Sequence, residues 1–312
     1  MPPSVRTAEP GTRLLIVSAD DYGLTEKVSR AILKAHRGGI VTSTSVLALA
    51  PAFGASVRWL SEVPRLGIGA HLAAVGEDPP LLSAAEIPSL VDRRGRLRAG
   101  WRQFLPLLTG GRIDPADLRR EFAAQLERIV AAGIHIDHLD THQDLHRWPS
   151  VRDAVLELAV RHEIGAVRIC RSSAHSPSGL AQRRLAHGAQ RRCRARGIAF
   201  PEASTGNDRP GQLDLPATIR ALHRLAVTRA SSAELITHPG GPDDPDRARY
   251  AWGYRWDDEL AALTSGTVRH AVKEYGFALG TFADLPTAGV LGQVADLPGA
   301  LDPTGTETPP GG

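Results

Sequence analysis

Two adjacent aspartates close the first apolar run of the chain. Asp20 and Asp21 follow residues 14–19 and precede a turn-like Tyr-Gly pair. Like charges in contact at the end of a buried strand resist joint ionisation unless a cation or a shared proton relieves them. The pair therefore predicts chemistry at this strand end.

A second set of acidic and imidazole side chains alternates along residues 138–146. Every second position is polar and ionisable there: His138, Asp140, His142, Asp144 and His146. In a β-strand, this alternation would place all five side chains on one face. Because the flanking Ile134, Ile136 and Leu139 favour burial, we expect this face to bind a metal or to carry out acid–base chemistry.

Further polar residues lie at or near the ends of other apolar runs, namely His71, Arg168 and His238. One carboxylate with two imidazoles is a common ligand set for a divalent cation that keeps open positions for water and substrate. A second carboxylate could then take a proton from water, and a further histidine could protonate a leaving group. Two adjacent aspartates allow this division of labour.

Other chemistries find less support in the sequence. The nucleophile motif GxSxG, the phosphate-binding motif GxxxxGK[ST] and the metal motif HExxH are all absent. A glycosidase using Asp20 and Asp140 as its two carboxylates stays open, but it would leave the histidines without a role.

The elements that must position these residues alternate between strands and helices. Short β-like runs recur at residues 14–19, 45–49, 66–72, 134–139, 166–170, 234–237 and 277–282, and helical patterns cover residues 115–132 and a segment from about Ser150 to before Gly165. This order predicts an α/β fold, a TIM-barrel-like (β/α) barrel of about seven mostly parallel strands, with a doubly wound sheet as the alternative. In such a barrel, catalytic groups lie at the carboxyl ends of the strands.

The chain of 312 residues is long enough for one large domain. We expect a flexible N-terminus over residues 1–12, a catalytic domain over 13–284 and a disordered tail over 285–312, rich in Gly, Pro and Thr. Residues 172–229 are Arg- and Gly-rich and break the strand–helix rhythm, apart from one helical stretch at 215–227. We interpret them as an insertion over one face.

Composition predicts a soluble, cytoplasmic protein. Cys170 and Cys193 are isolated thiols, and no run of apolar residues is long enough to span a membrane. The net charge is +3, and the basic stretch at 191–196 lacks interleaved aromatics, so we expect no nucleic-acid partner. A homodimer is left open.

Five motifs together resemble the YdjC-like carbohydrate deacetylase family, which includes chitooligosaccharide deacetylases. They match in order and spacing, and they occupy residues 18–25, 39–45, 67–72, 138–146 and 234–240. The likeness covers about residues 13–284. Residues 86–97 also resemble a segment of family members that include those associated with hopanoid biosynthesis.

The resemblance implies a TIM-barrel-like fold and metal-dependent removal of an N-acetyl group from an amino sugar or sugar conjugate, with release of acetate. Asp21, His71 and His142 would hold one divalent cation, Mg²⁺ or Zn²⁺. Asp20 would be the general base, although the two aspartates could exchange roles. His238 would be the acid or a substrate-side partner.

For the substrate, we expect Arg168, Asp140 and His146 to orient or bind the sugar. Trp252 and Tyr254 belong to an aromatic stretch, residues 249–256, that is suited to stack on a sugar ring. Two departures from the family pattern concern this region: Asp144 replaces a frequent histidine, and the stretch after His71 is about one residue short. A metal-dependent glycosidase or phosphoesterase, and a non-catalytic carbohydrate-binding barrel, are the alternative functions.

Overall fold

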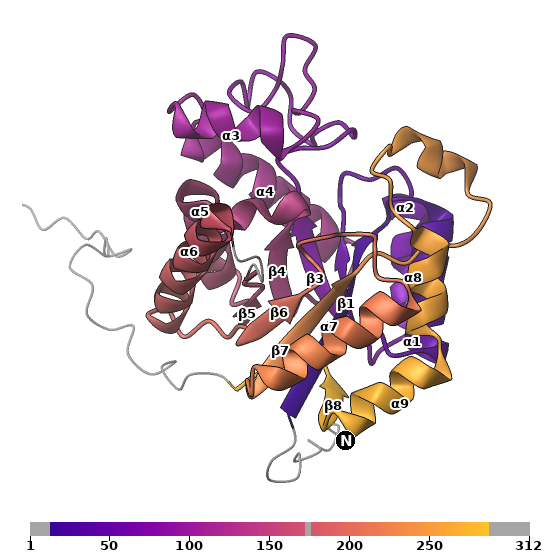
Figure 1. Ribbon diagram of the computed structural model, residues 1–312. Coiled ribbons are helices and arrows are strands. Elements are labelled where there is room, and N and C mark those ends of the chain that lie inside the picture. Colours follow the sequence, from indigo (N-terminus) through magenta and orange to yellow (C-terminus); the bar gives the residue numbers. More distant parts are fainter. Residues whose placement is uncertain (1–12, 172–175, 287–312) are drawn as a thin grey trace, which may run out of the picture.

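The computed structural model describes residues 13–171 and 176–286 (Figure 1). The predicted N-terminal extension, and the tail beyond Pro286, lie outside the described residues. No helix in the described part of the chain has both the length and the apolar character needed to cross a membrane.

A curled parallel sheet forms the centre of the molecule (Figure 1). The strands follow the order β5-β4-β3-β2-β1-β7-β6, and β8 pairs with the first half of β1. Their bounds are β1 Arg13–Tyr22, β2 Ser43–Val46, β3 Gly67–Leu72, β4 His138–Thr141, β5 Ala166–Val167, β6 Ala203–Thr205, β7 Ser232–Thr237 and β8 Phe277–Gly280.

The two ends of this sheet approach each other through short contacts. Ala199, just before β6, forms a parallel bridge with Ala166 of β5, and the Ala199 carbonyl accepts the Val167 amide at 3.0 Å. Farther along, the Ser204 hydroxyl accepts the Arg171 amide at 3.0 Å. The predicted barrel-like α/β fold is therefore confirmed, in preference to an open doubly wound sheet.

Helices surround the sheet (Figure 1). The α-helices are α1 Glu26–Gly38, α2 Phe53–Ser56, α3 Trp101–Thr109, α4 Pro115–Ala131, α5 Pro149–Arg161, α6 Pro177–Arg194, α7 Leu215–Val227, α8 Trp256–Leu263 and α9 Gly266–Glu274. Short 3₁₀ helices are η1 Val57–Glu62, η2 His142–Arg147, η3 Pro245–Arg249 and η4 Phe282–Asp284.

Helix α4 illustrates why the sequence folds this way. Asp114 caps its first turn by accepting the Ala116 amide at 2.8 Å, and Pro115 occupies the first helical position. Its buried stripe, Leu118, Phe122, Leu126 and Ile129, is fully inaccessible. Each such side chain contributes about 1.5–3 kcal/mol by leaving water, so this face fixes α4 against the barrel.

The segment predicted as an insertion over one face instead continues the alternation of helix and strand. It contains α6, the sheet strand β6 and α7, whose bounds match the predicted helical stretch. Strand β6 has only three residues, too few to show a period of two in the sequence. That brevity explains why the sequence alone does not reveal it.

Strand β4 also differs from the expectation. It begins at His138 rather than Ile134 and ends at Thr141, after which the chain enters η2. Gln143 and Asp144 adopt left-handed backbone angles, with φ of 56° and 53°. The prediction that five alternating side chains share one strand face is therefore wrong, because the strand ends before His142.

Candidate metal centre and active site

The first strand carries an irregularity where its two aspartates lie. Pairing of β1 with β2 shifts register between Ala19 and Tyr22, and Asp21 has a φ of 67°. In a regular strand, adjacent side chains point to opposite faces. The bulge breaks this alternation and allows both Asp20 and Asp21 to face the carboxyl end of the barrel.

Asp21, His71 and His142 bring three ligand atoms together. Asp21 Oδ1 lies 3.5 Å from His71 Nε2 and 3.4 Å from His142 Nδ1, and the two imidazole nitrogens are 3.4 Å apart. All three residues are buried, and Asp21 Oδ1 has no hydrogen-bond partner among the described residues. Because atoms bound tetrahedrally at about 2.1 Å from an ion are about 3.4 Å apart, these residues fit a divalent cation.

The carboxylates and imidazoles of this cluster shift one another's pKa. Burial raises the pKa of Asp21, but the nearby imidazoles of His142, His71 and His238 outweigh burial and lower that pKa below its usual value. Burial lowers the pKa of His71, but Asp140 and the two strand-end aspartates outweigh burial and raise it to about 9. The two shifts run in opposite directions because carboxylates and imidazoles lie close together here and stabilise each other's charged forms.

His71 is held in one orientation by residues behind it. Its Nδ1 lies 2.8 Å from Asp140 Oδ1 and 3.1 Å from the Ser45 hydroxyl. A carboxylate that accepts Nδ1–H fixes the ring so that Nε2 is directed at Asp21 and His142. Asp140 is completely buried, so in this structure it lies behind the histidine, and its predicted contact with a substrate stays a prediction.

Asp20, in contrast, faces a buried arginine. Both of its carboxylate oxygens accept hydrogen bonds from Arg168 at 2.7 Å, and Asp20 Oδ1 also accepts the Ser45 hydroxyl at 3.2 Å. Arg168 is fully buried and also pairs with Asp140 Oδ2 at 2.5 Å and Glu234 Oε1 at 2.8 Å. One guanidinium therefore joins three carboxylates, and these raise the pKa of Arg168 well above its usual value although burial opposes them.

Two other groups of donor atoms already have cationic partners. Asp20 and Asp140, which surround His71 on its other side, share Arg168. Asp144 lies beside His146 and Cys170, accepts the Cys170 thiol at 2.9 Å, and pairs with Arg147 at 2.7 Å. The cluster of Asp21, His71 and His142 is therefore the best candidate for the cation.

His238 lies across from this cluster at the end of β7. Its Nε2 is 3.9 Å from Asp20 Oδ2, and its Nδ1 has no hydrogen-bond partner in the described part of the chain. The His238 amide donates to Glu259 Oε2 at 2.5 Å, and Glu259 Oε1 accepts the Leu213 amide at 2.9 Å. Glu259 thereby fixes the backbone that carries His238.

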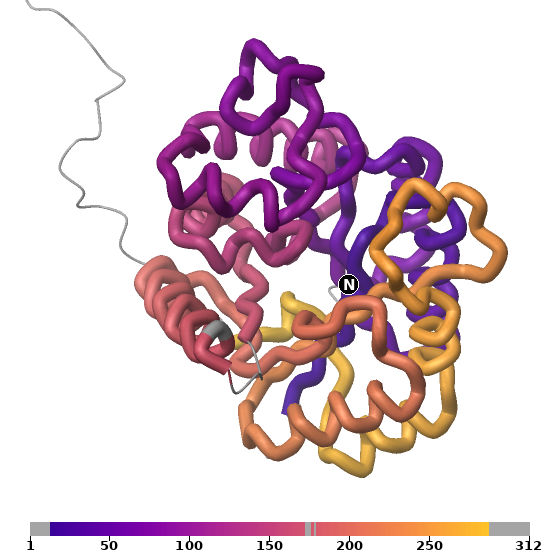
Figure 2. Tube along the Cα trace, turned by 45° about the horizontal axis from the view of Figure 1, so that its top comes forward, coloured from indigo at the N-terminus to yellow at the C-terminus, as the bar shows by residue number. Residues whose placement is uncertain are grey.

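Two aromatic side chains flank these groups. The ring of Trp252 lies 5.2 Å from that of His142, and the ring of Tyr254 lies 4.9 Å from that of His238. Trp252 also donates its indole N–H to Glu77 at 3.0 Å, so the loop after β7 meets the loop after β3. Figure 2 shows these loops, orange and purple, rising on the same side of the molecule.

His146 is buried away from solvent in the turn after β4. Its Nδ1 lies 2.7 Å from the Thr141 hydroxyl, and burial lowers its pKa to about 4. The imidazole is therefore neutral at pH 7. Its predicted contact with the sugar stays a prediction.

The sequence of this chain matches a known protein family over most of its length. The model of the family described as YdjC-like protein matches residues 14–274. The chain belongs to the YdjC-like family. Similar proteins include a carbohydrate deacetylase of Brevibacillus brevis, 28% identical over 87% of this chain and 99% of that one, and a chitooligosaccharide deacetylase of Proteus mirabilis, 28% identical over 87% and 98%.

A solved structure shows the same fold. It is that of an Enterococcus faecalis V583 protein whose assignment to cellobiose-phosphate cleavage is provisional. The TM-score is 0.72 at 23% identity, and the match covers 87% of this chain and 98% of that one. The shared fold thus covers most of the chain.

Three buried residues of this YdjC-like site were not predicted from the sequence. Ser45 contacts both Asp20 and His71, Glu234 pairs with Arg168, and Glu259 holds the His238 amide. Glu234 does leave a signal, since it is a charged residue inside an apolar strand. Ser45 and Glu259 leave none, because a serine in a strand and a glutamate in a helix are ordinary.

Proposed function

We propose that this protein is a metal-dependent hydrolase that removes the acetyl group from an N-acetylated amino sugar or sugar conjugate and releases acetate. The observation that carries the proposal is the buried cluster of Asp21, His71 and His142, with ligand atoms 3.4–3.5 Å apart. Membership of the YdjC-like family supports it, as do similar proteins named carbohydrate deacetylase and chitooligosaccharide deacetylase.

The three residues would hold one divalent cation. When bound, it would lower the pKa of water and polarise the acetyl carbonyl. Two imidazoles and one carboxylate, with separations that suit tetrahedral coordination, favour Zn²⁺ over Mg²⁺, which prefers oxygen ligands in an octahedral arrangement.

Asp20 is our candidate for the general base. Arg168 holds both of its oxygens, yet each carboxylate oxygen has a second lone pair with which to accept a proton. The arginine fixes the carboxylate in place and balances its charge. This arrangement supports the ligand role for Asp21 and the proton-accepting role for Asp20.

His238 is our candidate for the general acid. Amide hydrolysis breaks the bond between the acetyl carbon and the sugar nitrogen, and the departing amine needs a proton. His238 Nε2 lies 3.9 Å from Asp20 Oδ2, so a proton that Asp20 takes from water could pass to His238 and from there to the departing amine. Trp252 and Tyr254 would then pack against the sugar ring.

The test is acetate release from an N-acetylated chitooligosaccharide, measured beside bound metal. Wild-type protein loaded with Zn²⁺ should release acetate, whereas His142→Ala should lose both acetate release and metal. A matched control is His187→Ala, which removes an imidazole from α6 and should change neither. Unchanged activity and metal content in His142→Ala would overturn the proposal. New reducing ends instead of acetate would replace it with the glycosidase alternative, and phosphate release from a sugar phosphate assayed in parallel, without acetate release, would replace it with the phosphoesterase alternative.

A further inference from the structure

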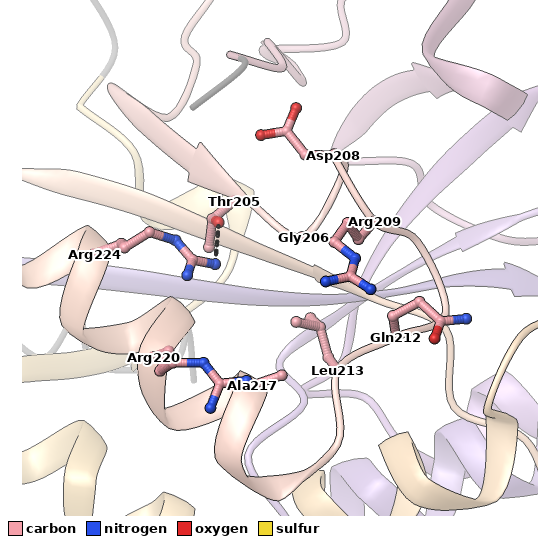
Figure 3. Close-up of a pocket in the computed structure, with 9 residues that line it drawn as sticks. All are labelled: Thr205, Gly206, Asp208, Arg209, Gln212, Leu213, Ala217, Arg220 and Arg224. Carbon is pink, nitrogen blue, oxygen red and sulfur yellow. Dashed lines mark hydrogen bonds between the residues drawn. The ribbon is translucent and has the colours of Figure 1, made fainter. Parts of the chain in front are cut away.

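A cavity lies between the loop after β6 and helix α7, apart from the proposed metal ligands (Figure 3). Its volume is about 240 Å³. Its lining includes three arginines, Arg209, Arg220 and Arg224, together with Thr205, whereas Asp21, His71 and His142 do not line it. The chemistry of this cavity is therefore separate from that of the metal centre.

The charge of these arginines is poorly balanced. In the ranges that the structure describes, none of the three forms an ion pair, and the one hydrogen bond that their side chains make runs from Arg224 to the Thr205 hydroxyl, at 3.4 Å. In Figure 3, the Asp208 carboxylate points away from the guanidinium groups. Its charge also helps, after those of Asp144 and Cys170 and against the effect of burial, to raise the pKa of Arg147.

Asp214 offsets part of the charge of Arg220: the pKa of Asp214 is lowered by the hydrogen bond from the Ala217 amide, by Arg255 and also by Arg220. Its hydrogen bonds, however, go to other groups. Asp214 caps α7 by accepting the Ala217 amide at 2.9 Å, and its other oxygen accepts a hydrogen bond from Arg255 at 2.8 Å. An excess of positive charge thus surrounds a concave space. A small anion is the simplest ligand that would balance it.

We propose that this cavity binds a small tetrahedral oxyanion of the phosphate class. Guanidinium groups present paired N–H donors that match the oxygens of phosphate, and charge-assisted bonds of this kind are stronger than neutral ones. The Thr205 hydroxyl supplies a further donor. The cavity is smaller than the about 300–1,000 Å³ of drug-sized ligand sites, so it suits a single phosphate group rather than an oligosaccharide.

The wall of the cavity is joined to the active site. Leu213 lines the cavity, and its amide donates to Glu259, which also holds the His238 amide. Nearby, Gly211 packs so closely that a Cβ there would lie 2.2 Å from the Tyr254 ring. An occupied cavity would therefore stabilise the same loop that supports Tyr254 and His238.

Calorimetric titration of inorganic phosphate into the Zn²⁺-loaded protein, at constant ionic strength, tests the site. The double variant Arg220→Gln/Arg224→Gln should bind phosphate at least about tenfold more weakly, because each lost charge-assisted hydrogen bond is worth that much or more. Both arginines are exposed, so the variant should fold normally, which its melting temperature will check. Arg58→Gln removes an exposed arginine of η1 and should bind as the wild type does.

Phosphate bound at the metal centre, and not in this cavity, would give a different result in the double variant. Such binding would persist in the double variant, so equal affinity in wild type and double variant would overturn the proposal, as would the absence of saturable binding at millimolar phosphate. A second titration, with glucose 6-phosphate, separates two sources of the ligand. Equal affinity for both probes indicates a free anion, and tighter binding of the ester indicates a phosphate carried on a larger molecule.

Discussion

Two neighbouring carboxylates of this protein have opposite surroundings. Asp21 faces two imidazoles, and one of its oxygens lacks a hydrogen-bond partner in the described structure. Asp20 faces a guanidinium that occupies both of its oxygens. Two residues that are adjacent in sequence therefore have different surroundings, because a single bulge in β1 directs the two side chains to different partners.

Neutralising each aspartate separately tests whether Asp20 and Asp21 have different roles. Asp21→Asn should lose bound metal and reduce kcat/KM by about 1,000-fold or more, since several kcal/mol of charge stabilisation disappear with the cation. Asp20→Asn should keep the metal and reduce kcat by about 100- to 10,000-fold, the usual effect of losing a general base. Metal content and acetate release measured on both variants decide between the roles, and the reverse pattern would exchange them.

This difference marks the limit of what the sequence predicts. The alternation of strands and helices, the barrel-like fold and the set of polar residues follow from patterns of hydrophobicity and from five motifs. The partners of Asp20 and Asp21 do not, because they depend on the backbone of a bulge with a left-handed residue. The turn that carries His142 was missed for a similar reason, since alternation in a sequence does not show where a strand ends.

Replacing Arg168 tests how much this arginine stabilises the buried carboxylates around it. Arg168→Met removes the cation shared by Asp20, Asp140 and Glu234 and leaves three buried carboxylates without it. Removing one partner from a buried ion pair costs about 3–5 kcal/mol of unfolding free energy, and urea denaturation at pH 7 measures it.

A matched arginine on the surface controls for this change. Arg112→Met alters an exposed side chain, and such substitutions usually change stability by less than about 0.5 kcal/mol. Comparable losses in the two variants would contradict the view that Arg168 organises the buried carboxylates.

The pH dependence of stability tests whether His146, which is not one of the proposed metal ligands, is held neutral by burial. Burial lowers the pKa of His146 to about 4, below the value near 6.5 of an unfolded chain. Protonation therefore favours unfolding, and the stability that His146 contributes is present above pH 6.5 and is lost as the pH falls towards 4. The loss is about 3 kcal/mol at most.

The variant His146→Gln should reduce this acid sensitivity. Urea denaturation of variant and wild type at pH 7 and pH 4.5 gives the difference directly, and carboxylates common to both proteins cancel. If the two proteins lose stability in parallel between these values, His146 is not held neutral by burial.

The smallest expected effect concerns Glu259, which touches neither proposed metal ligand nor substrate and holds the His238 amide. Glu259→Gln keeps one carbonyl oxygen but presents an amide N–H₂ to the second backbone donor, either His238 or Leu213. We expect kcat to fall about tenfold, as is usual when a residue that orients a functional group is lost, with metal content unchanged.

Glu121 provides the control for that variant. It is equally buried and accepts two backbone amides, those of Leu81 and Leu82, at 3.0 and 3.1 Å. Glu121→Gln should lower the melting temperature about as much as Glu259→Gln, because both changes leave a buried donor poorly satisfied. Only Glu259→Gln should lower kcat at a temperature where both variants are folded. Equal kcat values would reduce Glu259 to a purely structural residue and would remove the link between the loop after β6 and His238.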